Sequence, residues 1–341
     1  LNTTGTRNTA VGTGIYGSTH GALSANTTGT RNTAFGNQTL LNNTTASNNT
    51  AIGAEALLAN TTGTSNTAVG TYALDANTTS NNNTAIGTNA LTANTDGSEG
   101  TAVGKSALES NTTGESNCAF GHIALGLNTT GNNNTAIGRG AIYANTTGTQ
   151  NVAIGYFALA ANTTASNNVA VGHEALNDAT TATQNTGVGA YAGDSLTTGS
   201  YNVALGVNAL GTSTGSEKNV AIGVQALYSL TTGNYSVGVG YRALNDQTTG
   251  TQNTAIGGDA SYNITTGSSN CSMGYNSLGT CTTGSENTAL GHSCLQTTTG
   301  SENAGVGYRA LKDCSTGDMN TAVGEQALVN VTTGDGNTGI G

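Results

Sequence analysis

Small, polar and large apolar residues follow one another in a fixed order along this chain. The pentapeptide from Asn49 to Gly53 has the sequence Asn-Thr-Ala-Ile-Gly, and variants of it recur up to Gly341. There are twenty copies, and seventeen of the nineteen spacings between their final glycines are 17 residues, the others being 24 and 16. A period of this length indicates a stack of similar units, each in contact with its neighbours, rather than two globular domains.

The alternation inside the pentapeptide predicts a β-strand. Thr or Val at the second position and a large apolar residue at the fourth point to one side of a strand, and the third residue points to the other side. Short segments, frequent Gly and many β-branched residues disfavour a helix. The chain has no Pro, so every backbone amide can donate to a ladder. We therefore predict an all-β fold, a β-solenoid (parallel β-roll) of about twenty 17-residue coils, with room for two strands of about five residues in each coil.

The third position of the pentapeptide is always small and predicts close packing. Large side chains at the fourth position, such as Ile52, and in the following Ala-Leu segment, such as Leu57, are expected to meet inside a flattened coil. The small face is then available to a second chain, which predicts a homo-oligomer, with a trimer favoured. The alternative is a single-chain solenoid in which the small residues line tight corners. The predicted oligomer-packing residues are Ala51, Ala68, Ala85, Ala136, Ala153 and Ala170.

The units are predicted to stack in register over one repetitive shaft, residues 1–341, which we expect to be a fragment of a longer chain. Like residues then lie above one another, so Asn49, Asn66 and Asn83 should form a ladder of side-chain amides. The Thr-Thr-Gly segments are predicted turns, because Gly accepts a positive φ. Seven extra residues follow the first copy, and we expect residues 13–21 to form an inserted surface loop.

Charge and chemistry exclude several classes of protein. The net charge is -10 and the eight basic residues are scattered, which argues against a nucleic-acid partner. No apolar run reaches the roughly 18 residues of a membrane helix, so we expect no membrane insertion in this segment. An enzyme needs a non-repeating cluster of nucleophile, base and stabilising group, and none is visible. We accordingly predict no catalytic residue, no cofactor and no metal site. The five cysteines are expected to be small buried fillers.

One column of variable residues, directly after the pentapeptide glycine, is rich in aromatic and basic side chains. Such a column could stack on sugar rings or contact a protein partner. The alternative is that these are merely variable, solvent-facing turn positions. The possible ligand-contact residues are Lys105, His122, Arg139, Tyr156, His173, Tyr241, Tyr275, His292 and Tyr308.

The repeat resembles known fibrous proteins. Asn-Thr-Ala-Ile-Gly at 49–53 and Asn-Val-Ala-Ile-Gly at 151–155 resemble the core strand motif of trimeric autotransporter adhesin heads. That resemblance implies a parallel β-roll built from three chains. The longer unit, with Ala-Leu at 56–57 and Asn-Thr-Thr-Gly at 60–63, resembles repeats of phage tail fibres and large bacterial surface proteins. The period here is longer than the adhesin-head unit, which leaves the number of chains open.

These observations together predict a structural role outside the cell. We expect the shaft of an extracellular adhesive fibre or bacterial surface appendage that mediates attachment to cells or surfaces. A phage tail-fibre shaft, located on the virion, is the first alternative. A carbohydrate-binding surface along the aromatic column is the second, with cell-surface glycans or proteins as possible partners.

Overall fold

The computed structural model describes residues 2–12 and 21–341, and no helix occurs among them. The predicted loop at 13–21 therefore lies, apart from Gly21, outside the described residues. The chain divides into two compact units, Leu1–Asn168 and Val169–Gly341, and each is described by itself.

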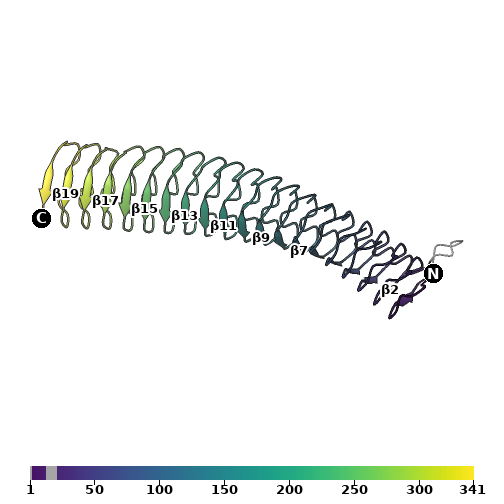
Figure 1. Cartoon of the computed structure of the whole chain (residues 1–341). Coiled ribbons are helices and arrows are strands. Elements are labelled where there is room, and N and C mark those ends of the chain that lie inside the picture. The colour runs from purple at the N-terminus through teal and green to yellow at the C-terminus, as the bar shows by residue number, and fades with distance from the viewer. Residues whose placement is uncertain (1, 13–20) are drawn as a thin grey trace. The chain divides into compact units, whose positions relative to one another are not determined.

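Each unit is a stack of coils that contributes one three-residue strand per coil (Figure 1). The first unit contains β1 (Thr9–Val11), β2 (Thr33–Phe35), β3 (Thr50–Ile52), β4 (Thr67–Val69), β5 (Thr84–Ile86), β6 (Thr101–Val103), β7 (Cys118–Phe120), β8 (Thr135–Ile137) and β9 (Val152–Ile154). The second contains β10 (Val169–Val171), β11 (Thr186–Val188), β12 (Val203–Leu205), β13 (Val220–Ile222), β14 (Val237–Val239), β15 (Thr254–Ile256), β16 (Cys271–Met273), β17 (Thr288–Leu290), β18 (Ala304–Val306), β19 (Thr321–Val323) and β20 (Thr338–Ile340).

Successive strands within each unit pair in parallel and in register. Thr50 lies beside Thr67 and Ile52 beside Val69, for example, and the same pairing continues from strand to strand. The all-β parallel solenoid with one coil per 17 residues is thereby confirmed. The 24-residue and 16-residue spacings do not break the register, because β1 still pairs with β2 and β17 with β18, residue for residue.

The second segment of each coil is not a strand, which corrects the expectation of two strands per coil. Leu57, in the Ala-Leu segment, has a φ of 51°, and Glu55 has a φ of 58°. Left-handed residues of this kind cost on the order of 1–3 kcal/mol each when they are not glycine. The cost is offset by bonds to the neighbouring coil: the Leu57 N–H donates to the Ala73 carbonyl at 3.0 Å and the Thr61 N–H to Thr78 at 3.0 Å. The ladder therefore runs through the turns as well as the strands.

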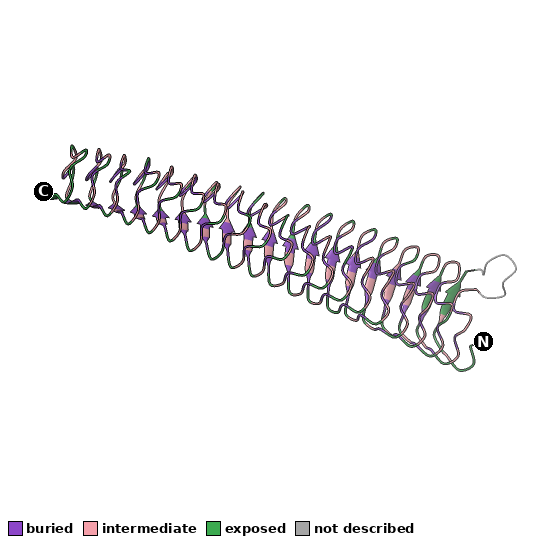
Figure 2. Ribbon diagram, turned by 90° about the horizontal axis from the view of Figure 1, so that it is seen from above, coloured by how far each residue is buried: buried purple, intermediate pink, exposed green. Residues whose placement is uncertain are grey.

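The interior contains the leucines and the small third residue of the strand. Leu57 and Ala51 are both fully buried, and so are Ala68, Ala85, Ala136, Ala153 and Ala170. Figure 2 shows buried segments within the strands, and the buried residue is the middle one in β2–β19. These six alanines are therefore covered by their own chain, and the prediction that they pack against another chain is wrong. The physical reason is visible at Gly187, where an added Cβ would lie 2.8 Å from Leu176 Cγ and 3.0 Å from the Ala192 carbonyl oxygen.

The fourth position of the pentapeptide faces outward, which is the second correction. Ile52 is 40% exposed and Phe35 57% exposed, whereas large side chains were expected inside at this position. Of the two large residues expected inside each coil, the Leu of the Ala-Leu segment, such as Leu57, is buried and the fourth pentapeptide residue is not, because the coil is too narrow for both. Each unit therefore presents an outer strand face, defined here as the first and third residues of its strands.

Two columns of buried asparagines connect the coils of the first unit. In the predicted ladder, the Asn66 N–H donates to Asn49 Oδ1 at 2.9 Å, and Asn66 Nδ2 donates to the Ser80 carbonyl at 2.9 Å. A second ladder, not predicted, precedes Thr-Thr-Gly: Asn60 Nδ2 donates to Asn43 Oδ1 at 3.0 Å. In the second unit this second column contains no asparagine, and its buried members are Ala179, Leu196, Ser213, Leu230, Gln247, Ile264, Cys281, Thr298 and Cys314.

Candidate functional site

The aromatic and basic column is the part of the surface that departs most from the Asn-Thr-Gly background. All nine predicted contact residues are exposed, at the position directly after the pentapeptide glycine. Lys105, His122, Arg139 and Tyr156 lie on successive coils of the first unit, and the other five lie in the second. The solenoid thus brings residues 17 apart in sequence next to one another.

In the first unit the column forms a small cluster of rings and one cation. The guanidinium of Arg139 lies 5.8 Å from the centre of the Tyr156 ring and 5.7 Å from that of Phe157. The two rings meet edge to face, with centroids 4.6 Å apart. Cation–ring contacts of this kind contribute roughly 0.5–1 kcal/mol at exposed sites.

The second unit contains a ladder of three neighbouring rings. The His292 ring lies between Tyr275 and Tyr308, with centroids 5.4 Å away on each side and interplanar angles of 27° and 32°. Because these rings come from three successive coils, the spacing of the coils sets the spacing of the rings. Tyr275 is 55% exposed and Tyr308 39% exposed, so the ladder is open to solvent.

One coil further toward the N-terminus, the same column lacks a side chain. The column runs Tyr241, Gly258, Tyr275, so two tyrosines flank a glycine. A Cβ added at Gly258 would lie 3.5 Å from Tyr275 Cδ2, and within 4 Å it would meet no atom outside that ring. The Tyr275 ring therefore lies against Gly258 at an ordinary contact distance.

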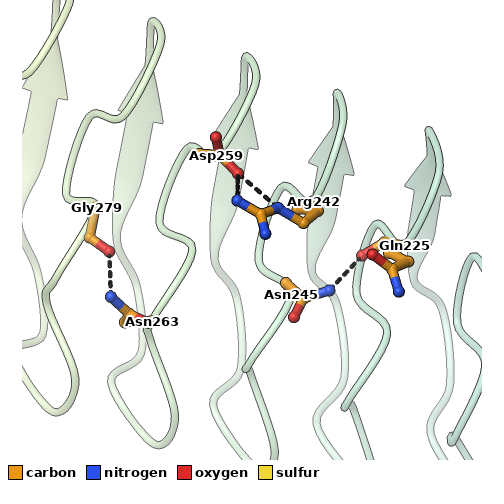
Figure 3. A network of polar contacts seen from close by, with 6 residues as sticks. All are labelled: Gln225, Arg242, Asn245, Asp259, Asn263 and Gly279. Carbon is orange, nitrogen blue, oxygen red and sulfur yellow. Dashed lines mark hydrogen bonds and ion pairs between the residues drawn. The ribbon is translucent and has the colours of Figure 1, made fainter.

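An ion pair joins two neighbouring coils beside the aromatic and basic column (Figure 3). Arg242 Nη2 and Nε both bind Asp259 Oδ1, at 2.8 and 2.9 Å. The guanidinium also lies 5.0 Å from the Tyr241 ring centre and 4.4 Å from that of Tyr262. Arg242 and Asp259 directly follow Tyr241 and Gly258 in the chain, so the pair lies beside the aromatic and basic column.

Asp259 and Tyr262 were not among the sequence candidates, although a signal for the first existed. Asp259 is 17 residues after Arg242, so the repeat alone places the two on adjacent coils. Tyr262 follows the Ala-Leu position of the coil, and only the left-handed turn of that segment brings its ring beneath Arg242.

The cysteines divide into two groups. All five are free thiols, and Cys281, Cys294 and Cys314 are buried, as predicted. Burial raises the pKa of the Cys281 thiol to about 11 and the pKa of the Cys294 thiol to about 12, so both stay protonated at neutral pH. Cys118 on β7 and Cys271 on β16 are only partly buried, because they occupy the first residue of their strands on the outer strand face.

The described residues contain neither a metal-binding cluster nor a membrane-spanning helix. In residues 2–12 and 21–341, no group of three or more His, Cys, Asp or Glu side chains is placed to hold a metal ion. No helix in that part of the chain is long and apolar enough to cross a membrane. Comparison with models of protein families gave no match, and comparison with curated protein sequences found no similar protein.

Proposed function

We propose that this chain is the shaft of an extracellular adhesive fibre or bacterial surface appendage, in which copies of the chain associate through the outer strand face. The observation that carries the proposal is the unbroken series of outward apolar residues at the third residue of the strands. It includes Phe35, Ile52, Ile86, Phe120, Ile137 and Ile154 in the first unit and Val188, Ile222, Ile256, Met273, Val306 and Val323 in the second, all exposed.

An exposed apolar surface of this extent supports an interaction site. Soluble monomers rarely present contiguous apolar patches beyond a few hundred Å². The cores of protein interfaces are poor in charged residues, and no strand of either unit contains Asp, Glu, Lys or Arg. The chain as a whole carries a net charge of -10, and two copies can meet on an uncharged face without strong repulsion.

The periodicity of the face favours a second copy over an unrelated partner. The strands repeat at about 4.8 Å, the spacing of neighbouring strands in any sheet. A partner can contact one apolar residue in every coil only if its own contact residues have the same spacing. Another copy of this chain has the same spacing, because it has the same repeat. The interface proposed is therefore the outer strand face. The small middle residues of the strands, on the opposite side, are buried inside each chain.

Charged substitutions on the face test the proposal. Changing Ile86→Asp and Ile137→Asp together leaves the buried leucines and alanines untouched, and it introduces two charges per chain into the interface. The matched control, Thr62→Asp with Thr113→Asp, alters exposed turn positions, where Asp96 already occurs in the native chain. Sedimentation velocity should show the first variant shifted toward single chains and the control assembled like the native protein. Equal assembly of the two variants, or a monomeric native protein, would contradict the proposal.

The shaft of a phage tail fibre is the alternative assignment for the same self-associating rod. Both roles need a long, regular coil stack, and both leave recognition to other parts of the polypeptide. The sequence on either side of these residues separates them: a secretion signal or membrane anchor supports the cell appendage, and a self-cleaving chaperone domain supports the phage fibre.

A further inference from the structure

We propose that two copies of this chain pack outer strand face to outer strand face with their coil stacks antiparallel, so that the first unit of one copy contacts the second unit of the other. This inference rests on the proposed association through the outer strand face and deepens it, because it names the direction of the partner and the residues that meet. The partner is a second copy that arrives from the opposite direction, as a copy attached to a facing surface would.

The outer strand face consists of two columns with different chemistry. Along β3–β9 the first residues of the strands are mostly threonines, and the third residues are all Ile, Val or Phe. Among the described residues, a strand hydroxyl such as that of Thr84 makes no hydrogen bond within the chain. The turn threonines differ, because Thr61 Oγ1 donates to the Thr78 carbonyl at 3.1 Å. The face therefore presents one column of hydroxyl groups that can pair with a partner and one column of apolar side chains.

The relative direction of the two coil stacks decides which columns meet. If two identical faces pack with their stacks parallel, the first-residue column of each copy faces the third-residue column of the other, because both copies have the same hand. If the stacks are antiparallel, each column faces the column of the same kind. A hydroxyl buried against an apolar side chain loses its hydrogen bond to water without a replacement, whereas two opposed threonine hydroxyls can donate and accept. The antiparallel packing is therefore favoured.

The order of residues in the first-residue column fits one antiparallel register. From β3 to β9 the first residues are Thr50, Thr67, Thr84, Thr101, Cys118, Thr135 and Val152. In the reverse direction, from β20 to β14, they are Thr338, Thr321, Ala304, Thr288, Cys271, Thr254 and Val237. Six of these seven opposed pairs are identical, and Thr84 with Ala304 is the exception. With the second series in the forward direction and the cysteines aligned, from β12 to β18, only three of the seven pairs are identical.

This register places the bulkiest residues of the two series together. β7 faces β16, so Cys118 lies opposite Cys271 of the second copy and Phe120 opposite Met273 of the second copy. Phe120 is 47% exposed and Met273 is 50% exposed, so each has a large apolar surface to bury. A flexible thioether packs favourably against an aromatic ring.

The two thiols of the outer strand face provide the test of direction. The variants Cys271→Ser and Cys118→Ser each keep one thiol on the face, and their other three thiols are buried. A short bismaleimide should give at least tenfold more covalent dimer when the two variants are co-expressed than when either is expressed alone. Mass spectrometry of the joined peptides should show Cys118 linked to Cys271.

Sedimentation velocity of the same samples separates the failure of this inference from the failure of the proposed function. Chains that associate but link Cys118 to Cys118, or that associate and form no cross-link, overturn the antiparallel packing while association itself stands. Samples that sediment as single chains overturn the association through the face, and the antiparallel packing with it.

A pair of opposite charges tests the register. Thr101 on β6 faces Thr288 of the second copy, on β17, whereas Thr254 on β15 lies two strands away from that position. Thr101→Lys with Thr288→Asp places opposite charges against each other across the interface. The matched control, Thr101→Lys with Thr254→Asp, carries the same charges on strands that are not opposed.

We expect the first double variant to associate at least tenfold more tightly than the control in sedimentation equilibrium at low salt, because opposed charges attract across an interface. Equal affinities of the two double variants would contradict the register. Circular dichroism confirms that both variants are folded before their affinities are compared.

Discussion

At the scale of single residues, the alternation of small and large residues predicts which side chains share a face of the strand, but not which face is buried. Period-2 alternation correctly placed Thr50 and Ile52 on one side of β3 and Ala51 on the other. It does not say which side is the interior, and the usual assumption that large apolar residues point inward gave the wrong answer. The interior of a 17-residue coil already holds a residue such as Leu57, so the middle strand position has room only for Ala, Gly or Ser.

The narrow interior leads to a prediction at Ala136. Ala136 is fully buried on β8, and its replacement by Leu adds three carbon atoms where the equivalent Gly187 already has Leu176 Cγ 2.8 Å from the Cβ position. We expect Ala136→Leu to destabilise its coils by at least the roughly 1–3 kcal/mol typical of overpacking. Asn132→Leu, at a partly exposed turn position, should cost less. Thermal melting followed by circular dichroism compares the two, and equal melting temperatures would contradict this account of the core.

At the scale of the elements, register and the first asparagine ladder could be predicted, and the second half of the coil could not. The strict 17-residue spacing requires that like residues lie side by side. Both the register of the strands and the first asparagine ladder follow from it. The Ala-Leu segment was expected to form a second strand, yet its Leu57 adopts a φ of 51°. Bonds to neighbouring coils override the local preference there, and no single coil contains that information. The exposure of the aromatic column followed from its variability, whereas the contacts between its rings needed the turn geometry.

The two asparagine columns should tolerate substitution differently. Asn117 Oδ1 accepts from the buried Asn134 N–H at 2.9 Å, so Asn117→Leu leaves a backbone donor without its partner. Asn111 Oδ1 accepts only from the Asn128 side chain, whose Nδ2 also donates to the Gly131 carbonyl at 3.0 Å. Leucine already occupies the column of Asn111 in the second unit, at Leu196 and Leu230.

We therefore expect Asn117→Leu to be the more damaging of these two changes, by about 1–3 kcal/mol, the cost of an unsatisfied buried donor. Hydrogen exchange measures this coil by coil: protection of the amides around 117–137 should fall by tenfold or more in Asn117→Leu and much less in Asn111→Leu. Equal loss of protection in the two variants would show that the columns are equivalent.

At the scale of the whole molecule, the composition and the outer surface point to assembly. The chain has few charged residues, and all those in the described part lie outside the strands. The strands instead carry exposed apolar residues. The sequence-based hypothesis placed self-association on the small-residue side of the strand, and the structure shows that this side is buried within its own chain. The interface that we propose therefore lies on the opposite side of the same strands.

The most direct test of the central claim is the reaction of Cys118 and Cys271 with maleimide in the assembled protein. Both thiols lie on the outer strand face, whereas burial raises the pKa of Cys281 and Cys294 and keeps those thiols unreactive at mildly alkaline pH. If copies of the chain cover the face, Cys118 and Cys271 react slowly in the native protein and quickly in the variant carrying Ile86→Asp and Ile137→Asp. If both thiols react at the same fast rate in the native protein and in that variant, the strand face is open to solvent and the chains do not associate through it.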